Sequence, residues 1–236
     1  MKLTYLYHSG FVVEGVHCTI IFDYFKDSDD KYLKNSLASF GGKLYVCASH
    51  WHPDHFNKEV LLWKNIRPDT VYLFSEDILQ KKKTSPGTTT FLNKGDVWQD
   101  DNISIKAFGS TDAGISFLIE TEGKKIFHAG DLNNWHWDEE STPEEIQEAE
   151  QSYLDELQTL SAEVKQLDLA MFPVDSRLGK NYQRGAEQFV DTIQTGFFTP
   201  MHFGSKYRQA NAFQPYAEKA GCRFFALTKT GQSLIF

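Results

Sequence analysis

The sequence is poor in cysteine and contains no hydrophobic run long enough to span a membrane. Its three cysteines are Cys18, Cys47 and Cys222, and the first two lie within apolar runs. An odd number of widely spaced cysteines favours buried thiols over disulfides, which suits a reducing compartment. The opening stretch MKLTYLYHSGFVVEG also lacks the hydrophobic core of a signal peptide. We therefore expect a cytoplasmic protein that does not enter a membrane.

Basic charge is scarce as well. The 24 Lys and Arg residues are outnumbered by 32 Asp and Glu residues, and the formal net charge is −8. Such a chain lacks the basic surface that binds duplex nucleic acid, so we expect a small-molecule substrate instead. The 236 residues, 41% of them hydrophobic, are enough for a sizeable core and predict one domain over residues 1–236. The oligomeric state is left open.

Short β-type runs occur in both halves of the chain, and helical patterns follow them. We predict strands over residues 3–7, 11–14, 18–22, 44–48, 71–74, 103–108, 115–120, 124–128, 168–172 and 197–201, with two more at the end. Helices are predicted over 58–64, 143–167, 186–194 and 210–220, the second beginning at a Thr142–Pro143–Glu145 capping box. Residues 81–90 are expected to form a surface loop. This order favours two stacked β-sheets covered by helices.

The stretch SHWHPDHF, residues 49–56, contains three of the eight histidines. It directly follows the predicted strand 44–48, and loops at the carboxyl ends of buried strands often carry chemistry in α/β folds. His50 and His52 alternate, so both point the same way on an extended segment. Imidazole and carboxylate groups suit zinc or a similar divalent ion. The alternative is a polar loop in which three histidines and an aspartate coincide by chance.

The pattern His-x-His-x-Asp-His resembles the signature of the metallo-β-lactamase fold superfamily. Three further stretches match that family in its order: IIFDYF gives Asp23, FHAGD gives Asp131 and TPMHF gives His202. YHSGF and FHAGD resemble most the branch that includes lactonases and other metal-dependent hydrolases. The resemblance implies an α/β fold, a four-layer αββα sandwich of two mixed β-sheets flanked by helices.

The resemblance also implies ligand roles. His50 and His52 would bind one metal ion, Asp54, His55 and His202 a second, and Asp131 would bridge the two. Asp23 would orient a ligand by a hydrogen bond, and His128 would also lie behind the ligands. Zinc is the expected cofactor, as one or two ions, with Mn or Fe possible. Taken alone, Asp131 could instead be a turn residue and His202 a core histidine.

The implied activity is that of a metal-dependent hydrolase. A metal-bound hydroxide, held by Asp54 and Asp131, would act on a small, anionic ester, lactone or phosphodiester. His8 in YHSGF would lie near the metal as a proton donor or hydrogen-bond partner, unless it is a structural histidine. The alternative function is a non-catalytic metal- or ligand-binding protein with an incomplete first metal site.

That incompleteness arises from a departure from the family pattern. The family supplies one more histidine to the first metal, but no histidine lies between His55 and His128. The corresponding stretch FGSTDAGISF offers Asp112 as a substitute, although it could equally be a turn residue before Gly114. His136 could instead reach the site from the loop after Asp131.

Two loops offer candidates for substrate binding. In DLNNWHWD, residues 131–138, Trp135 and Trp137 flank His136 and could wall a pocket with it, or these aromatics could pack against the long helix. In FPVDSRLGKNYQRG, residues 172–185, Arg177 and Tyr182 lie in a basic loop that would favour an anionic substrate. The alternative for Arg177 is a surface ion pair with Asp175.

Overall fold

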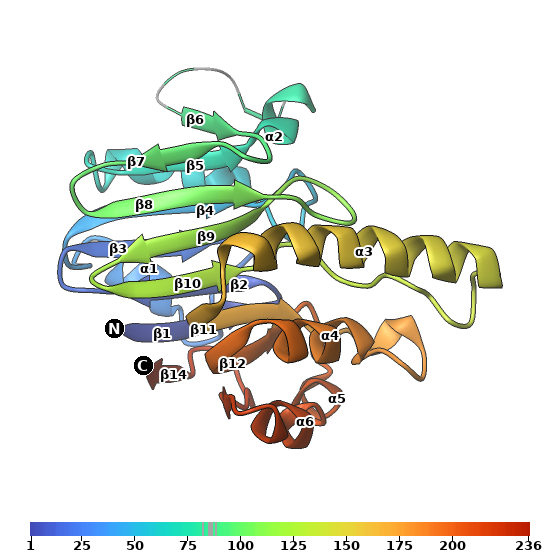
Figure 1. The fold of residues 1–236 in the computed structure, drawn as a ribbon. Coiled ribbons are helices and arrows are strands. Elements are labelled where there is room, and N and C mark those ends of the chain that lie inside the picture. The colour runs from blue at the N-terminus through green and yellow to red at the C-terminus, as the bar shows by residue number, and fades with distance from the viewer. Residues whose placement is uncertain (82, 85–86, 88) are drawn as a thin grey trace.

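The computed structural model describes residues 1–81, 83–84, 87 and 89–236 and contains two seven-stranded mixed β-sheets (Figure 1). The first sheet has the order β14-β1-β2-β3-β4-β5-β6. Its strands are β1 (Lys2–Tyr7), β2 (Gly10–Glu14), β3 (Cys18–Phe22), β4 (Lys43–Ala48), β5 (Val71–Ser75), β6 (Thr89–Leu92) and β14 (Ser233–Ile235). β1 to β3 pair antiparallel, and β3 to β6 pair parallel.

The second sheet repeats this mixture in the order β13-β12-β11-β10-β9-β8-β7. Its strands are β7 (Val97–Gln99), β8 (Ile103–Phe108), β9 (Ser116–Thr121), β10 (Lys124–His128), β11 (Gln166–Pro173), β12 (Gln194–Met201) and β13 (Arg223–Phe224). β7 to β10 pair antiparallel, and β10 to β13 pair parallel. β1 pairs with β14, so the two ends of the described chain lie side by side.

Helices cover the outer face of each sheet. Leu33 of α1 (Tyr32–Ser36) and Trp63 of the 3₁₀ helix η1 (Lys58–Asn65) pack on the first sheet, and α2 (Glu76–Gln80) follows β5. On the second sheet, α3 (Pro143–Glu163) and α4 (Arg184–Thr192) bury Tyr153 and Phe189 (Figure 1). The predicted four-layer αββα architecture is therefore confirmed.

Several predicted elements differ from those observed. The helix predicted over 210–220 is two short helices, α5 (Tyr207–Asn211) and α6 (Gln214–Lys219), because Pro215 lacks the N–H that a continuous helix needs. The long helix begins at the predicted capping box but ends at Glu163, four residues early. The short edge strands β6 and β7 were not predicted. β6 occupies the end of the predicted loop 81–90, of which residues 82, 85, 86 and 88 lie outside the described residues.

The three cysteines are buried free thiols, as predicted. None of the helices in the described part of the chain is long and apolar enough to cross a membrane.

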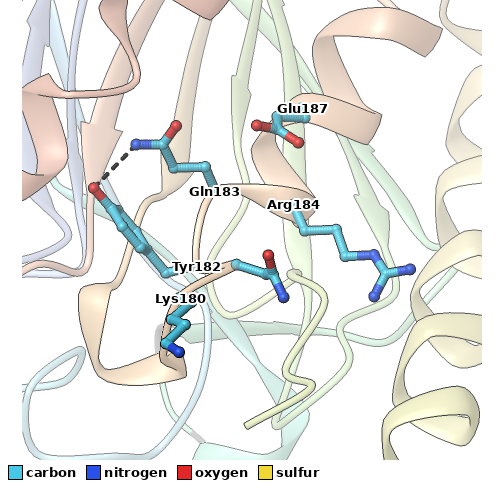
Figure 2. A pocket seen from close by; sticks show the side chains of 6 residues that line it. Lys180, Tyr182, Gln183, Arg184 and Glu187 are labelled. Carbon is cyan, nitrogen blue, oxygen red and sulfur yellow. Dashed lines mark hydrogen bonds between the residues drawn. The ribbon is translucent and has the colours of Figure 1, made fainter. Parts of the chain in front are cut away.

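The loop after β11 contains the short 3₁₀ helix η2 (Ser176–Leu178) and leads to the start of α4. A cavity of about 520 Å³ lies there, lined by Lys180, Asn181, Tyr182, Gln183, Arg184 and Glu187 (Figure 2). The Tyr182 hydroxyl donates a hydrogen bond to the Gln209 carbonyl and accepts one from the Gln183 amide. Tyr182 therefore packs toward α5.

The predicted site residues follow strand ends at one edge of the two sheets. His8 follows β1, Asp23 follows β3, and the His50–His55 segment follows β4. On the second sheet, Asp112 lies in the loop after β8, and Asp131 and His202 follow β10 and β12. β1, β3 and β4 run in one direction, as do β8, β10 and β12, so each sheet presents these side chains at a single edge.

Gly114 lies where the loop after β8 meets the histidine segment after β4. Gly114 has a φ of 67°, and a Cβ there would collide with the Ser49 carbonyl and lie 2.6 Å from the His50 Cβ. The next residue, Ile115, donates its N–H to the same carbonyl at 2.9 Å. The loop after β8 therefore approaches the histidine segment as closely as its backbone allows.

We predict that Gly114→Ala lowers the free energy of unfolding by about 3 kcal/mol or more, because it adds overpacking to the unfavourable left-handed conformation. Gly123→Ala is the matched control, since Gly123 has a φ of 73° but no atom within 4 Å of the added Cβ. The control should lose only about 1–2 kcal/mol. Urea unfolding of both variants measures the difference, and equal losses would contradict the close approach at Gly114.

Candidate metal centre

The Asp131 carboxylate is the centre on which three imidazoles converge. It is 5% exposed, and its Oδ2 lies 3.2 Å from His50 Nε2. Its Oδ1 lies 3.2 Å from His55 Nε2 and 3.3 Å from His202 Nε2. The histidine segment of the first sheet and two strand ends of the second therefore meet at one buried carboxylate.

Asp23 holds two of these imidazoles from behind. Its carboxylate accepts hydrogen bonds from the Ser49 N–H at 2.7 Å, the Ser49 hydroxyl at 2.6 Å and His55 Nδ1 at 2.7 Å. The Ser49 hydroxyl proton is thus committed to Asp23, and the Ser49 oxygen accepts from His50 Nδ1 at 2.9 Å. Both Nδ1 atoms therefore carry the proton, which leaves both Nε2 lone pairs facing Asp131.

His128 supports the turn that leads to Asp131. Its Nε2 donates to the Ser9 carbonyl at 2.9 Å, so its Nδ1 is the acceptor for the Gly130 N–H at 3.2 Å. The ring stacks on Phe22 of β3, with the two planes 2° apart and their centroids 4.8 Å apart. His128 thus links the turn after β10 to the first sheet.

Asp175 contacts this centre, although the sequence analysis did not place it there. Its Oδ2 accepts a hydrogen bond from His202 Nδ1 at 2.9 Å, so the His202 Nε2 lone pair faces Asp131. The same carboxylate binds the Arg177 guanidinium through Nε and Nη2. Asp175 follows β11 as Asp131 follows β10, and the same strand-end rule applied to FPVDS would have found it.

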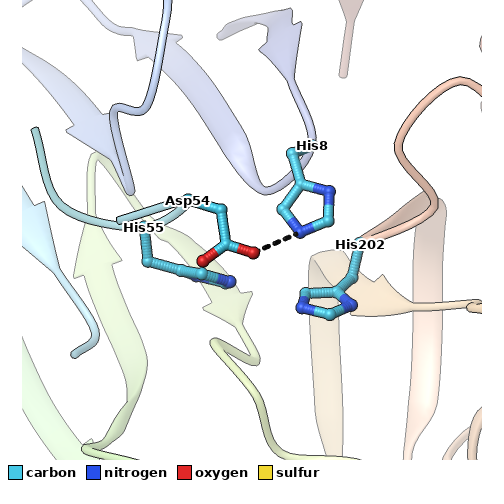
Figure 3. Close-up of side chains that lie close together, drawn as sticks. All are labelled: His8, Asp54, His55 and His202. Carbon is cyan, nitrogen blue, oxygen red and sulfur yellow. Dashed lines mark ion pairs between the residues drawn. The ribbon is translucent and has the colours of Figure 1, made fainter. Parts of the chain in front are cut away.

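A second set of ligand atoms lies beside this centre. His8, Asp54, His55 and His202 each offer one nitrogen or oxygen, and these atoms lie within 4.8 Å of one another (Figure 3). His8 Nε2 is 3.3 Å from Asp54 Oδ2. The structure therefore brings the three residues predicted for the second metal together and adds His8 to them.

The first metal site is arranged differently from the sequence-based expectation. The His50 and His52 rings are neighbours, with centroids 4.6 Å apart, but their ligand atoms belong to different sets. His50 groups with His55 and Asp131, whereas His52 groups with Asp112 and Asp131. His52 Nδ1 lies 3.7 Å from Asp112 Oδ2, and these two side chains are 31% and 53% exposed. Asp112 is thus close enough to replace the missing histidine, at the rim of the site.

The buried atoms of this centre fit a divalent cation. His8 Nε2, His50 Nε2, His55 Nε2 and Asp131 Oδ1 are buried and have no hydrogen-bond partner among the described residues. A buried polar atom without a partner costs about 1–3 kcal/mol, so four in one cluster require an explanation. Cations bound by the ligand sets that contain these atoms would satisfy them, because imidazole nitrogens and carboxylate oxygens are preferred ligands of divalent cations.

The electrostatics of the cluster keep its carboxylates ionised. Burial alone would raise the pKa of Asp131, but the imidazoles of His55 and His202 outweigh it and hold that pKa well below 3.8. The adjacent His8 imidazole, whose Nε2 lies 3.3 Å from Asp54 Oδ2, lowers the pKa of Asp54 in the same direction. Burial lowers the pKa of His8 to about 4, so this imidazole is neutral at pH 7 and has a lone pair available to a cation.

Backbone strain accompanies the site. His8, Asp23 and His202 adopt φ values of 58°, 41° and 63°, a region that residues other than glycine rarely occupy. Such conformations persist only where the surrounding structure enforces them, and they cluster at functional sites. All three residues directly follow strands, so each strained position turns a side chain at the edge of its sheet.

The centre opens into a cleft of about 450 Å³. Its lining residues are His52, Asp54, Thr111, Asp112, Asp131, Trp135, Trp137, Arg177 and His202. The Trp135 and Trp137 rings are stacked with a 17° angle between their planes, and Trp135 Nε1 donates to the Asp131 carbonyl at 2.7 Å. A second cavity of about 380 Å³, bounded by Tyr7, Phe25 and Phe203, shares Asp54, Arg177 and His202 with this cleft.

Two predicted substrate-facing residues do not line the cleft. His136 is buried between Trp135 and Trp137, and its Nδ1 and Nε2 lie 2.9 Å from the Asn134 carbonyl and 3.6 Å from Asp138 Oδ1. It belongs to none of the three ligand sets and is not among the residues that line the cleft, so it does not complete the first metal site. Tyr182 lines the separate cavity of Figure 2. The placement of both residues at the substrate is therefore corrected, whereas Trp135 and Arg177 do reach the cleft.

A family model described as the β-lactamase superfamily domain matches residues 2–148. The chain belongs to this superfamily. Two solved structures show that its fold is the metallo-β-lactamase fold. Igni18, a metallo hydrolase from the archaeon Ignicoccus hospitalis, is 19% identical and matches with a TM-score of 0.69 over 99% of this chain and 97% of its own. YhfI from Bacillus subtilis, a metallo-β-lactamase fold protein, is 13% identical with a TM-score of 0.63 over 99% and 98%.

Two curated relatives of this superfamily member carry the name UPF0173 metal-dependent hydrolase. The one from Korarchaeum cryptofilum is 26% identical over 139 residues, which cover 56% of this chain and 60% of the relative. The one from Alkaliphilus metalliredigens is 28% identical over 145 residues, which cover 56% and 63%. The chain thus matches about 60% of the length of these relatives.

We predict that Asp175→Asn weakens metal binding about 10- to 100-fold, because an outer carboxylate fixes the tautomer and orientation of a ligating imidazole. Asp168→Asn is the matched control, since Asp168 pairs with Lys124 on the surface of the second sheet. Competition with a chromogenic chelator measures the zinc affinity of each variant. Equal affinities of Asp175→Asn and the wild type would show that Asp175 does not orient His202.

Proposed function

We propose that this chain is a metal-dependent hydrolase that holds zinc and acts on a small anionic ester, lactone or phosphodiester. One observation carries the proposal. The Nε2 atoms of His50, His55 and His202 converge on the buried Asp131 carboxylate at the floor of an open cleft. The match to the superfamily and the names of the curated relatives support the same class of activity.

The residues that would hold metal are those of the three ligand sets, with Asp131 in two of them. Bound divalent cations supply a nucleophile at neutral pH by lowering the pKa of water, and they polarise the electrophile. Asp54 is 43% exposed at the cleft and stays ionised, so its carboxylate can accept a hydrogen bond from a water molecule there. Asp54 and Asp131 would together orient that water toward the substrate.

Arg177 supports an anionic substrate. Its Nε and Nη2 donate to Asp175, whereas Nη1 has no hydrogen-bond partner among the described residues. The guanidinium carbon lies 6.0 Å from the centre of the Trp137 ring, at the edge shared by the two cavities. A pre-oriented guanidinium beside the cation ligands suits a carboxylate or phosphate group of the substrate.

The alternative function, a metal-binding protein without catalysis, is favoured by the exposure of His52 and Asp112 at the first site. A weak first site would leave one cation in the centre. The two functions differ in turnover, so activity and metal content must be measured on the same preparation.

We predict that protein purified without chelator contains about one or two zinc ions per chain and hydrolyses a member of a panel of chromogenic phosphodiesters, esters and lactones. His55→Ala should lower kcat/KM at least ~100-fold, since it removes a ligand common to two sets. His17→Ala, at an exposed histidine, is the control. Chelator treatment should abolish the activity, and zinc should restore it. Metal binding without turnover on any substrate would favour the alternative, and absence of metal after reconstitution would refute both functions.

We predict that Arg177→Gln raises KM about 10- to 100-fold for an anionic substrate, because a hydrogen bond to a charged group is lost. A neutral ester of similar size should keep its KM. Arg184→Gln is the matched control, since Arg184 lies in the neighbouring cavity and pairs with Glu150. Zinc content is measured for each variant. An equal rise in KM for the anionic and the neutral substrate would show that Arg177 does not bind the anionic group.

A further inference from the structure

His8 is held in place by its backbone on both sides. Its N–H donates to the Tyr5 hydroxyl at 2.9 Å, and its carbonyl accepts the His202 N–H at 3.1 Å. Its φ of 58° is unfavourable for a residue with a side chain. The strained backbone therefore aims this ring, and it ties the end of β1 to the residue after β12.

The ring points into the ligand set shown in Figure 3. Its centroid lies 4.3 Å from that of His202 and 5.6 Å from that of His55. His8 Nε2 lies 3.3 Å from Asp54 Oδ2, yet it is buried and forms no hydrogen bond with any described residue. A buried nitrogen that is near a carboxylate but not hydrogen-bonded to it is placed as a ligand atom would be.

Charge balance leads to the same conclusion. The carboxylates of Asp54 and Asp131 both lie against this group of imidazoles. Burying negative charge is costly unless a positive charge or a metal ion compensates it. A divalent cation among these atoms would compensate the buried Asp131 carboxylate and the adjacent Asp54 carboxylate, which is 43% exposed.

We propose that His8 Nε2 is a fourth protein ligand of the cation held by Asp54, His55 and His202. This inference rests on the metal binding in the proposed function and adds a ligand to it. It also makes the two metal positions unequal. The position held by Asp54, His55 and His202, called the inner position here, gains His8 as a buried ligand. The outer position has the exposed pair His52 and Asp112 with Asp131.

The inner position therefore binds its cation first and more tightly, because it has more ligands and they are more rigidly held. His8 then acts as a ligand and not as the proton donor that the sequence suggested, since a nitrogen bound to a cation cannot donate a proton. The two roles predict different effects of removing the His8 imidazole. A ligand affects metal affinity, and a proton donor affects only turnover.

The test is a titration of metal-free full-length chain with Zn²⁺ against a chromogenic chelator, and with Co²⁺ followed by its visible absorption. The variants are His8→Asn and His8→Gly, because both residues tolerate the left-handed conformation. His17→Asn, at an exposed histidine of the turn after β2, is the matched control. Circular dichroism and urea unfolding verify that each variant is folded.

Wild-type chain should bind a first ion tightly and a second more weakly. Both His8 variants should weaken the first step about 10- to 100-fold and change the Co²⁺ spectrum, which reports coordination geometry. The control should match the wild type in both titrations.

Unchanged Zn²⁺ affinity and Co²⁺ spectrum in folded His8 variants would overturn the proposal, and lost turnover in the same variants would assign His8 to proton transfer. The proposed hydrolase would survive that result. Tight, His8-dependent metal binding without hydrolysis of the substrate panel would support His8 as a ligand and refute the hydrolase. A wild type that binds no metal would refute both.

Discussion

The buried Asp131 carboxylate imposes the strictest physical constraint on the structure. A carboxylate that is 5% exposed must be surrounded by partners, and here those partners are three imidazoles from two segments, the one after β4 and the one after β12. The ends of β4, β10 and β12 must therefore meet within a few ångströms. The strained backbones of His8, Asp23 and His202 show where the chain departs from favoured conformations to satisfy this requirement.

Each sheet supplies an outer carboxylate to the imidazoles. Asp23 of the first sheet fixes His50 and His55, and Asp175 of the second fixes His202. The centre therefore lies where the two sheets meet, and their packing sets its geometry. His128 stacking on Phe22 and the close approach of Gly114 to Ser49 hold the sheets in register at this point. Residues that touch no substrate thus control the ligand atoms.

The centre is asymmetric in its exposure. The inner imidazoles of His50, His55 and His202 are buried, whereas His52 and Asp112 lie at the rim of the cleft. Trp135, Trp137 and Arg177 line the same cleft. The buried imidazoles are held rigidly, as expected of permanent ligands. The residues at the rim and around the cleft are accessible to solvent, as expected of residues that contact a substrate.

The sequence alone determined the αββα architecture, most strand positions and the histidine cluster, because these depend on local hydrophobic periodicity and on ligand-type residues close together in the chain. It did not determine the short strands β6 and β7, since edge strands of three or four residues carry little periodicity. Only the tertiary structure decided how the ligands group. His52 joins Asp112 and not His50, His8 joins Asp54, and His136 belongs to no ligand set, because these outcomes depend on where distant strand ends meet. Asp175 became recognisable only once β11 placed its carboxylate beside His202, which is 27 residues away in the chain.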